Sequence, residues 1–408
     1  MVSTSTSLPA RTLEELAKAP KVQTAFQFFE ANADAFTRAQ IAISSVPAPP
    51  FAERERAEYL RRKFQELRLE HPGLDKEGNC IGLRRGRSRE PLLAISAHLD
   101  TVFPAGTDVT VRQEQGKLFA PGIADDACGL VALMALAQAL EVAGIETEGS
   151  LLFVGSVGEE GEGNLRGVRH LFTEGSWASL VNAFISFDGP GLDRIINRAL
   201  GSKRFRVTMR GAGGHSWSDF GIANPVHALG RAIARLVSYP APAVPRTTFN
   251  VGRIEGGKSI NAIPSEAFID VDLRSTDERE LRRLEAFFRR AMREGADEEN
   301  ANRRPGTPLE LNIQLLGERP SGETPADSAI VEVALEATRM FGVKPLLDQA
   351  STDSNLPISL GIPAITLGAG GTSGNSHTLE EWYDPRDRAL GLKRALLVIL
   401  GLVGLAQD

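Results

Sequence analysis

The chain has 408 residues, of which 42% are apolar and 24% are charged, a composition that is ordinary for a globular protein. A chain of this length is too long for one compact core and predicts two domains. The formal net charge of −6 gives no indication of nucleic-acid binding, and the two cysteines, Cys80 and Cys128, suit a reducing compartment better than a disulfide framework.

The two ends of the chain show no signal for export or membrane anchoring. Residues 1–10 lack the basic start and apolar core of a secretory signal. The longest apolar run, 395–406, is too short to span a bilayer and predicts a buried helix. We therefore expect a cytoplasmic protein with no membrane partner.

Side chains that can bind metal follow the predicted strands of a parallel sheet. In open α/β sheets, ligands bind outside the carboxyl ends of the strands, so polar residues in these places converge in one crevice. The apolar runs and the side chains after them are 92–97 before His98, 151–154 before Glu159 and Glu160, 183–187 before Asp188, and 363–367 before the glycine-rich turn that leads to His377.

Asp125 comes instead from a turn, 121–126, just before a predicted helix that begins near Cys128. This helix has apolar residues on one face, so it can pack on the sheet while its start faces the crevice. Asp125 would therefore join the side chains that follow the strands.

Together these residues indicate a hydrolase with two metal ions. Two neutral imidazoles and the carboxylates of Asp125, Glu160 and Asp188 suit a pair of divalent ions, and Glu159 is placed to act as a base beside them. Without cations the carboxylates would repel one another. Two divalent ions would bring a charge of +4 against the −3 of Asp125, Glu160 and Asp188. Taken singly, a His-x-Asp is more often a surface or core pair, and a Glu-Glu a solvated face. Their joint occurrence after separate strands favours the metal site.

Between Asp188 and His377 the pattern changes to that of a smaller domain. The predicted elements are strand 205–210, helix 225–237, strands 247–254 and 267–273, helix 277–293 and strand 309–316. This order is that of a ferredoxin-like split unit. We therefore expect a doubly wound α/β catalytic domain with a mixed sheet, 1–198 with 317–408, and an inserted ferredoxin-like α+β domain, 199–316.

Six ordered motifs resemble those of the cocatalytic zinc metallopeptidases, the family of peptidase T, glutamate carboxypeptidase, succinyl-diaminopimelate desuccinylase, acetylornithine deacetylase and aminoacylase. The motifs are Ser96–Val102, Gly122–Asp126, Gly158–Gly161, Phe187–Gly189, Gly213–Trp217 and Ser376–Thr378. The resemblance covers nearly the whole chain after about residue 40. The segments GHSWSDFG at 214–221 and HTLEEW at 377–382, with an aspartate at 188, are most similar to the peptidase T-like branch.

The resemblance implies a role for each residue of the crevice. The ligands would be His98 and Asp188 for one ion, Glu160 and His377 for the other, and Asp125 for both. Asp100 would orient His98, and the Asp125–Asp126 peptide bond would be cis. Zinc would be the metal, with manganese or cobalt as alternatives, and a water bridging the two ions would lose its proton to Glu159.

One position departs from the family pattern. Many relatives have a lysine two residues after the bridging aspartate, where this chain has Ala127, followed by Cys128. We interpret Cys128 as a small packed residue in preference to a metal ligand.

The resemblance also gives the inserted domain a role, as a lid and as the interface of a homodimer. His215, from the same or the partner subunit, would reach the oxyanion of the tetrahedral intermediate. Asn261 and Arg274 would grip a substrate carboxylate, for which a planar guanidinium is suited. The 13-residue step between them spans one strand and would bring both to the same rim. Without the resemblance, a turn histidine, a turn asparagine and a surface arginine would be the preferred interpretation.

The expected reaction is hydrolysis of an amide bond in a short peptide, by an exopeptidase of the tripeptidase or peptidase T type. An N-acyl-amino-acid deacylase or a carboxypeptidase of the same family would share every catalytic residue, so the sequence does not separate these activities. A dinuclear phosphoesterase would more often show histidine-rich motifs and a basic cradle for phosphate. A non-catalytic binding relative would normally have lost Glu159 or a ligand.

Overall fold

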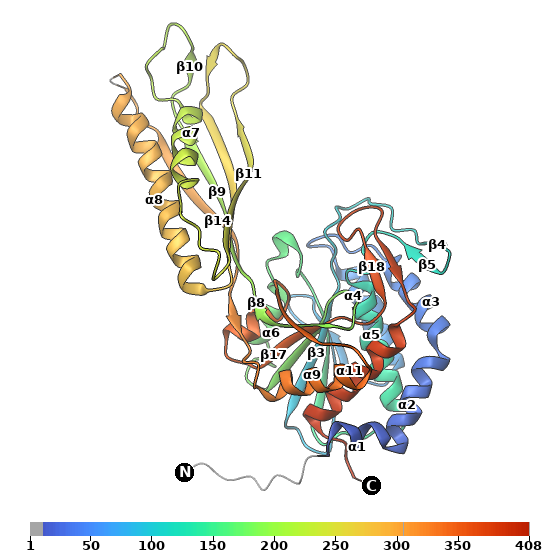
Figure 1. Ribbon diagram of the computed structural model, residues 1–408. Coiled ribbons are helices and arrows are strands. Elements are labelled where there is room, and N and C mark those ends of the chain that lie inside the picture. The colour runs from blue at the N-terminus through green and yellow to red at the C-terminus, as the bar shows by residue number, and fades with distance from the viewer. Residues whose placement is uncertain (1–10, 305, 408) are drawn as a thin grey trace. The chain divides into compact units, whose positions relative to one another are not determined.

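The computed structural model describes residues 11–304 and 306–407 (Figure 1). Segment 1–10, on which the expected absence of a secretory signal rests, lies outside the described residues. The chain divides into two compact units. The larger unit extends to Ala199 and resumes at Glu323, and the inserted unit is Leu200–Gly322.

A nine-stranded mixed sheet forms the centre of the larger unit, in the order β1-β2-β6-β3-β7-β17-β8-β15 with β16 beside β8. The four strands predicted from apolar runs are β6, β3, β7 and β17, which are neighbours and pair in parallel. Their carboxyl ends therefore meet at one edge of the sheet, as predicted. The strands are β1 Glu70–Leu74, β2 Cys80–Arg84, β3 Leu92–His98, β6 Ser150–Ser156, β7 Ala183–Phe187, β8 Arg194–Ala199, β15 Gly322–Glu323, β16 Leu346–Ala350 and β17 Ala364–Leu367.

Helices cover both faces of this sheet, so the fold is doubly wound, as predicted. Alternate residues of β3 face opposite ways: Leu93 and Ile95 belong to one apolar core, and Leu92 and Ala94 to another. The first core is completed by helices α1 to α5, α9 and α11, and the second by α6 and α10 (Figure 1). These helices are α1 Leu13–Lys18, α2 Pro20–Ala31, α3 Ala33–Ser44, α4 Arg54–Glu66, α5 Ala127–Val142, α6 Arg166–Thr173, α9 Ala329–Met340, α10 Asn355–Ser359 and α11 Arg388–Val403.

The C-terminal apolar run forms α11, which is buried against the sheet, as the sequence predicted. Leu396 and Leu400 have no exposed surface. Among residues 11–304 and 306–407, none of the helices combines the length and the apolar character that crossing a bilayer requires.

A second, four-stranded sheet of the larger unit joins two segments that are far apart in the sequence. Its order is β18-β19-β5-β4, and Trp382 of β19 pairs with Phe119 of β5. The strands are β4 Arg112–Glu114, β5 Lys117–Phe119, β18 Thr372–Gly374 and β19 Trp382–Asp384. The turn after β5 carries Asp125, and the loop between β18 and β19 carries His377, so this sheet holds the two segments side by side.

The inserted unit has the predicted order of strands and helices. Its four-stranded sheet has the order β11-β13-β9-β14, which is the strand order of the ferredoxin-like fold. All three strand pairs are antiparallel. The helices α7 and α8 pack together on one face of the sheet (Figure 1), and residues of β13 are alternately buried beneath them. The elements are β9 Gly201–Arg210, β10 Gly214–His215, α7 Pro225–Leu236, β11 Thr247–Gly256, β12 Ala262–Ile263, β13 Glu266–Ser275, α8 Glu278–Asn302 and β14 Glu310–Arg319.

Several elements of the inserted unit are longer than the sequence predicted, among them β9, which begins at Gly201 instead of residue 205. Helix α8 begins after Asp277, whose carboxylate accepts the backbone N–H groups of Arg279 and Glu280, and continues to Asn302 instead of residue 293. Strand β14 continues to Arg319 instead of residue 316 because it pairs with β9 as far as Ser202.

Candidate metal centre

Two groups of metal-capable side chains lie at the carboxyl edge of the central sheet, and they share Asp125. The first group is His98, Asp125 and Asp188, and the second is Asp125, Glu160 and His377. Within each group, the candidate ligand atoms lie within 4.8 Å of one another. An aspartate common to both groups has the position needed to bridge two ions. The structure thus brings together all five residues that the sequence analysis singled out as ligands.

His98 ends strand β3 and is 1% exposed, so its ring is held from all sides. Its Nδ1 lies 3.0 Å from the carbonyl oxygen of Asp100, and its Nε2 lies 2.8 Å from Oδ1 of Asp125. A neutral imidazole carries one N–H, so donation from Nδ1 to the carbonyl leaves the Nε2 lone pair directed at the Asp125 side of the site. This is the orientation that a metal-binding histidine needs.

Both histidines face carboxylate oxygens, as the ligands of a shared metal ion do. Nε2 of His377 lies 3.1 Å from Oδ2 of Asp125 and 2.8 Å from Oε1 of Glu160. These two contacts raise the pKa of His377 to about 10. Burial opposes the charged form of His98, but the carboxylates of Asp100 and Asp125 outweigh it and raise its pKa well above the ordinary value. Imidazole nitrogens and carboxylate oxygens are the donors that zinc and similar ions bind, and here they face one another at 2.8 to 3.1 Å, so the donor set fits such ions.

The carboxylates differ in how well their charge is stabilised. Burial opposes the charge of Asp125, but contacts with His377 and His98 dominate and hold its pKa below the usual range. Asp188 behaves in the opposite way, because burial and the nearby charges of Asp125 and Glu159 raise its pKa well above the ordinary value. A cation in the first group would remove this penalty on Asp188.

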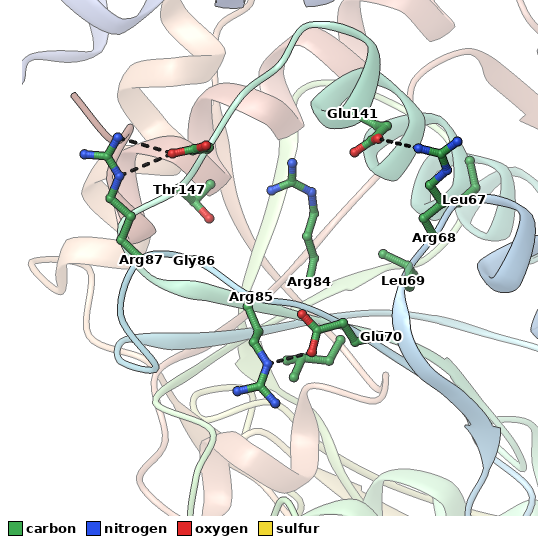
Figure 2. A pocket seen from close by; sticks show the side chains of 12 residues that line it. Leu67, Arg68, Leu69, Glu70, Arg84, Arg85, Gly86, Arg87, Glu141 and Thr147 are labelled. Atoms are coloured by element: carbon green, nitrogen blue, oxygen red, sulfur yellow. Dashed lines mark hydrogen bonds and ion pairs between the residues drawn. The ribbon is translucent and has the colours of Figure 1, made fainter. Parts of the chain in front are cut away.

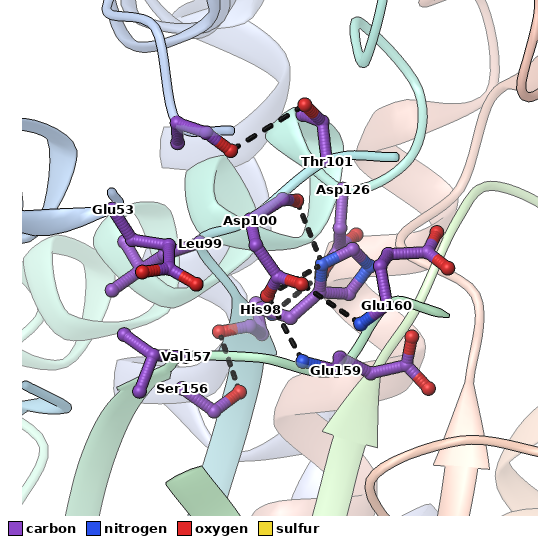
Figure 3. A network of polar contacts seen from close by, with 12 residues as sticks. Glu53, His98, Leu99, Asp100, Thr101, Asp126, Ser156, Val157, Glu159 and Glu160 are labelled. Carbon is purple, nitrogen blue, oxygen red and sulfur yellow. Dashed lines mark hydrogen bonds and ion pairs between the residues drawn. The ribbon is translucent and has the colours of Figure 1, made fainter. Parts of the chain in front are cut away.

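Asp100 also holds the loop that carries the two glutamates, a role that the sequence analysis did not predict (Figure 3). Its carboxylate accepts the backbone N–H groups of Glu159 at 3.0 Å and Glu160 at 2.8 Å. The carboxylate oxygen lies 3.7 Å from Nδ1 of His98, too far for a hydrogen bond, and the main-chain carbonyl of Asp100 fills that role instead. Asp100 therefore orients His98 through its backbone and positions the Glu159–Glu160 turn through its side chain.

Glu159 lies beside the candidate ligands and is 4% exposed. With His98 and Glu160 it forms a third group whose candidate ligand atoms lie within 4.8 Å of one another. A carboxylate in this position is within reach of the proton of a water held among the ligands, as a general base must be.

Asp126 is a structural residue that the sequence analysis missed. Its carboxylate accepts the backbone N–H groups of His98 at 3.1 Å, Gly129 at 3.1 Å and Gly189 at 3.2 Å. It therefore ties together the end of β3, the start of α5 and the segment after Asp188. The cis peptide bond expected between Asp125 and Asp126 is present. The sequence feature that could have predicted this role is the position of Asp126 at the start of a helix, where a carboxylate commonly caps backbone N–H groups.

Glu381 is a second buried carboxylate without an assigned role in the sequence analysis, although it stands in the quoted segment 377–382. It accepts backbone N–H groups of the turn that carries Asp125. Cys128, in contrast, lies where the preferred interpretation put it. It is buried, and its thiol donates to the carbonyl of Ala124 at 3.0 Å.

His215 and Asn261 are neighbours in the inserted unit, because His215 of β10 pairs with Ala262, the first residue of β12, and Asn261 directly precedes it. Nδ1 of the exposed His215 accepts the backbone N–H groups of Trp217 at 3.2 Å and Ser218 at 3.4 Å, so the neutral ring carries its proton on Nε2. The carbonyl of Asn261 accepts the N–H of Ser216 at 3.0 Å.

Arg274 lies far from these two residues within the inserted unit, so the expectation that Asn261 and Arg274 share one rim is wrong. Asn261 stands before β13, whereas Arg274 is next to the last residue of this ten-residue strand, so roughly 25 Å of extended chain separates them. The guanidinium of Arg274 donates to Asp272 at 2.6 Å.

A separate pocket of about 340 Å³ lies on the larger unit, beside β2 and the loop after α5 (Figure 2). Its ion pairs are Arg68 with Glu141 at 3.8 Å, Arg85 with Glu70 at 2.6 Å and Arg87 with Glu146 at 3.2 Å. Because each of these guanidinium groups already has a carboxylate partner, we place the candidate active site at the sheet edge instead.

The amino-acid sequence matches the profile of peptidase family M20/M25/M40 over residues 94–400. An uncharacterized protein of Bacillus subtilis (strain 168), YqjE, is 27% identical over 332 residues, which are 78% of this chain and 85% of that protein. A succinyl-diaminopimelate desuccinylase of Methylibium petroleiphilum is 28% identical over 233 residues, which are 52% of this chain and 60% of that enzyme.

Solved structures share this fold over nearly their whole length. The aminopeptidase PepT from Bacillus cereus ATCC 10987 superposes with a TM-score of 0.74 at 22% identity, over 91% of this chain and 99% of PepT. YxeP of Bacillus subtilis, described as a dinuclear metal-binding peptidase of the M20 family, superposes with a TM-score of 0.68 at 19% identity, over 92% of this chain and 99% of YxeP.

Proposed function

The chain belongs to peptidase family M20/M25/M40 and is a metal-dependent peptidase, and from this premise we propose that it is an exopeptidase that cleaves di- or tripeptides with two divalent ions. The observation that carries the proposal is the position of Asp125, shared by two ligand groups beside Glu159. The fold shared with the PepT aminopeptidase supports the peptide substrate. Zinc is the proposed metal, with manganese and cobalt as alternatives.

The proposed site assigns a task to each side chain. His98 and Asp188 would hold one ion, Glu160 and His377 the other, and Asp125 both. When bound, the ions would polarise the scissile carbonyl and acidify a water molecule.

Glu159 would carry the proton through the reaction. Its carboxylate would accept a proton from the attacking water and deliver it to the nitrogen of the leaving amine. Its burial, and the hydrogen bond from its backbone N–H to Asp100, support this role because both limit the movement of residue 159. Nε2–H of His215 would donate a hydrogen bond to the oxyanion, which its tautomer supports.

We further propose that the chain forms a homodimer through residues 199–316, with His215 serving the site of one subunit or of its partner. Asn261 and Arg274 would bind the substrate carboxylate. Within one inserted unit Arg274 is too far from Asn261 and His215 for one carboxylate to contact all three, so in the proposed homodimer Arg274 would come from one subunit and Asn261, with its neighbour His215, from the other.

A deacylase acting on N-acyl amino acids is the second candidate, and the similarity to the desuccinylase favours it. The deciding experiment is a screen of metal-free protein, reloaded with zinc, manganese or cobalt, against di- and tripeptides and against N-acetyl and N-succinyl amino acids. The Glu159→Gln variant serves as the matched control for contaminating hydrolases. Cleavage of short peptides at least tenfold faster than of every N-acyl amino acid would support the peptidase, and the reverse order would replace it with the deacylase.

A further inference from the structure

The loop that carries His377 is compact and ends at Glu381. His377 has a left-handed backbone conformation, with a φ of 65°. Within the loop, the N–H of Thr378 donates to the carbonyl of Asn375 at 3.1 Å, and the N–H of Glu381 donates to the carbonyl of Thr378 at 3.2 Å. The His377 side chain remains half exposed, so packing around the ring does little to fix its position. Its position therefore depends on how this loop is anchored.

The anchor is the carboxylate of Glu381, which has no exposed surface. Oε1 accepts the backbone N–H groups of Ala124 at 2.8 Å and Asp125 at 3.0 Å, and Oε2 accepts that of Gly122 at 3.3 Å. Among the described residues, no lysine or arginine forms an ion pair with Glu381, so backbone donors alone hold its charge. Removing the carboxylate would leave these buried N–H groups without an acceptor, which is costly in a protein interior.

The backbone of Glu381 contacts the same segment. Its carbonyl accepts the N–H of Ala120 at 3.1 Å, and the next residue, Trp382, pairs with Phe119 across β19 and β5. Glu381 is thus hydrogen-bonded to both ends of the turn that leads to Asp125: its backbone carbonyl to Ala120 and its carboxylate to Ala124 and Asp125. Four residues before it, His377 contacts the side chain of that same aspartate, 252 residues away in the sequence.

We propose that Glu381 is a positioning residue that sets the separation of Asp125 and His377, and thereby the metal affinity of the group that these two side chains form with Glu160. The inference rests on the proposed metal-dependent function. Glu381 lies outside the three groups of candidate ligands and acts through the backbone of Asp125 and through the loop of His377.

Asp384 provides a matched control. It is a buried carboxylate at the end of β19, the strand that follows Glu381, at 4% exposure, and within residues 11–304 and 306–407 its side chain bonds to Arg386 and not to the turn at 122–125. Asp384→Ala should weaken the same hairpin without loosening the turn. If metal affinity falls in Glu381→Ala but not in Asp384→Ala, the loss reflects the position of the metal-capable side chains and not the general stability of the hairpin.

The test is a calorimetric titration of chelator-treated protein with zinc and with manganese. Glu381→Ala should bind the ion of the Asp125–Glu160–His377 group roughly 10- to 100-fold more weakly, as expected on loss of an outer partner of metal ligands. Glu381→Asp should weaken metal binding to a similar degree, because a side chain shorter by one bond moves the carboxylate about 1.5 Å away from its backbone donors. Glu381→Gln should lose only about threefold, since its amide oxygen can still accept from Ala124 and Asp125.

Two further measurements distinguish a local from a global effect. The thermal unfolding midpoint in chelator reports the stability of each variant, and excess metal should restore the turnover of Glu381→Ala. Wild-type affinity in both Glu381→Ala and Glu381→Asp would overturn the proposal, as would an equal loss of affinity in Asp384→Ala. If Glu381→Ala does not fold, the Asp variant decides. A wild-type chain that binds no divalent ion would overturn the proposed function itself, and that result is distinct from the other two.

Discussion

Replacing Glu159 by glutamine gives the sharpest test of the proposed mechanism. The change preserves the size of the side chain, and the contact that positions residue 159 is made by its backbone N–H to Asp100 at 3.0 Å. The turn should therefore stay in place, with Glu160 also held at 2.8 Å. What is lost is a group that accepts a proton. Loss of a general base lowers the rate by about 100- to 10,000-fold, which adds roughly 3 to 5 kcal/mol to the barrier.

A paired variant is needed because Glu159 and Glu160 both lie within 4.8 Å of the ligand atoms of His98. Glu160→Gln should lose one equivalent of metal, since Glu160 also contacts His377 at 2.8 Å. Glu159→Gln should keep both equivalents while turnover collapses. The assay combines tripeptide hydrolysis under saturating substrate with the metal content of the same samples after dialysis. Retention of more than a tenth of wild-type turnover, with both ions bound, would refute the assignment of Glu159 as the base. Loss of one ion would make Glu159 a ligand instead.

Four further outcomes are expected. Asp125→Ala should lower occupancy at both metal positions and His377→Ala mainly at one, because Asp125 belongs to both ligand groups; two full equivalents in dialysed Asp125→Ala would remove it from the site. Mixing Glu159→Gln with His215→Ala chains should restore activity if His215 serves the partner's site, whereas no recovery despite proven subunit exchange would assign it to its own chain. Arg274→Ala should lower kcat/KM by about 10- to 200-fold on a peptide with a free carboxylate and little on its amide; equal losses would indicate a structural role. In metal-free protein the pKa of His377 is raised to about 10, so its contacts stabilise the fold below the unfolded pKa of 6.5 and are lost as pH rises through 10. Metal must displace that proton, so apparent affinity should rise with pH, and calorimetry in buffers of different ionisation enthalpy should detect proton release; a pH-independent affinity with no released proton would contradict this.

The metal-capable residues of the central sheet could be predicted because they follow a simple rule. Each buried parallel strand appears as an apolar run, and the polar residue after it must lie at the common edge. His98, Glu160 and Asp188 were found in this way, and β6, β3, β7 and β17 are indeed neighbours. The order of strands and helices along the inserted unit could be predicted equally well, from the periodicity of its apolar residues.

The supporting carboxylates could not be predicted, because their partners are backbone N–H groups. The carboxylates of Asp126 and Glu381 accept backbone N–H groups, so the identity of the partner residue gives no signal. Such contacts depend on the backbone shape of turns that are far away in the sequence. The error over Arg274 has a related cause, since a residue count does not reveal that the intervening strand runs straight through the sheet. The helices α1 to α4 were not predicted, although Val22, Phe26 and Phe29 form a helical apolar stripe.

The place of β17 in the central sheet has a consequence for the order of events during synthesis. β17 lies between β7 and β8, yet it leaves the ribosome after the whole inserted unit. About 170 residues separate the ends of β8 and β17, which is roughly 10 to 30 s of translation. The inserted unit is synthesised during that interval, and its last strand, β14, is complete before β17 is made. Until β17 is available, the edges of β7 and β8 that pair with it remain unpaired. The nascent chain is then most open to aggregation or chaperone capture, and the larger unit closes last.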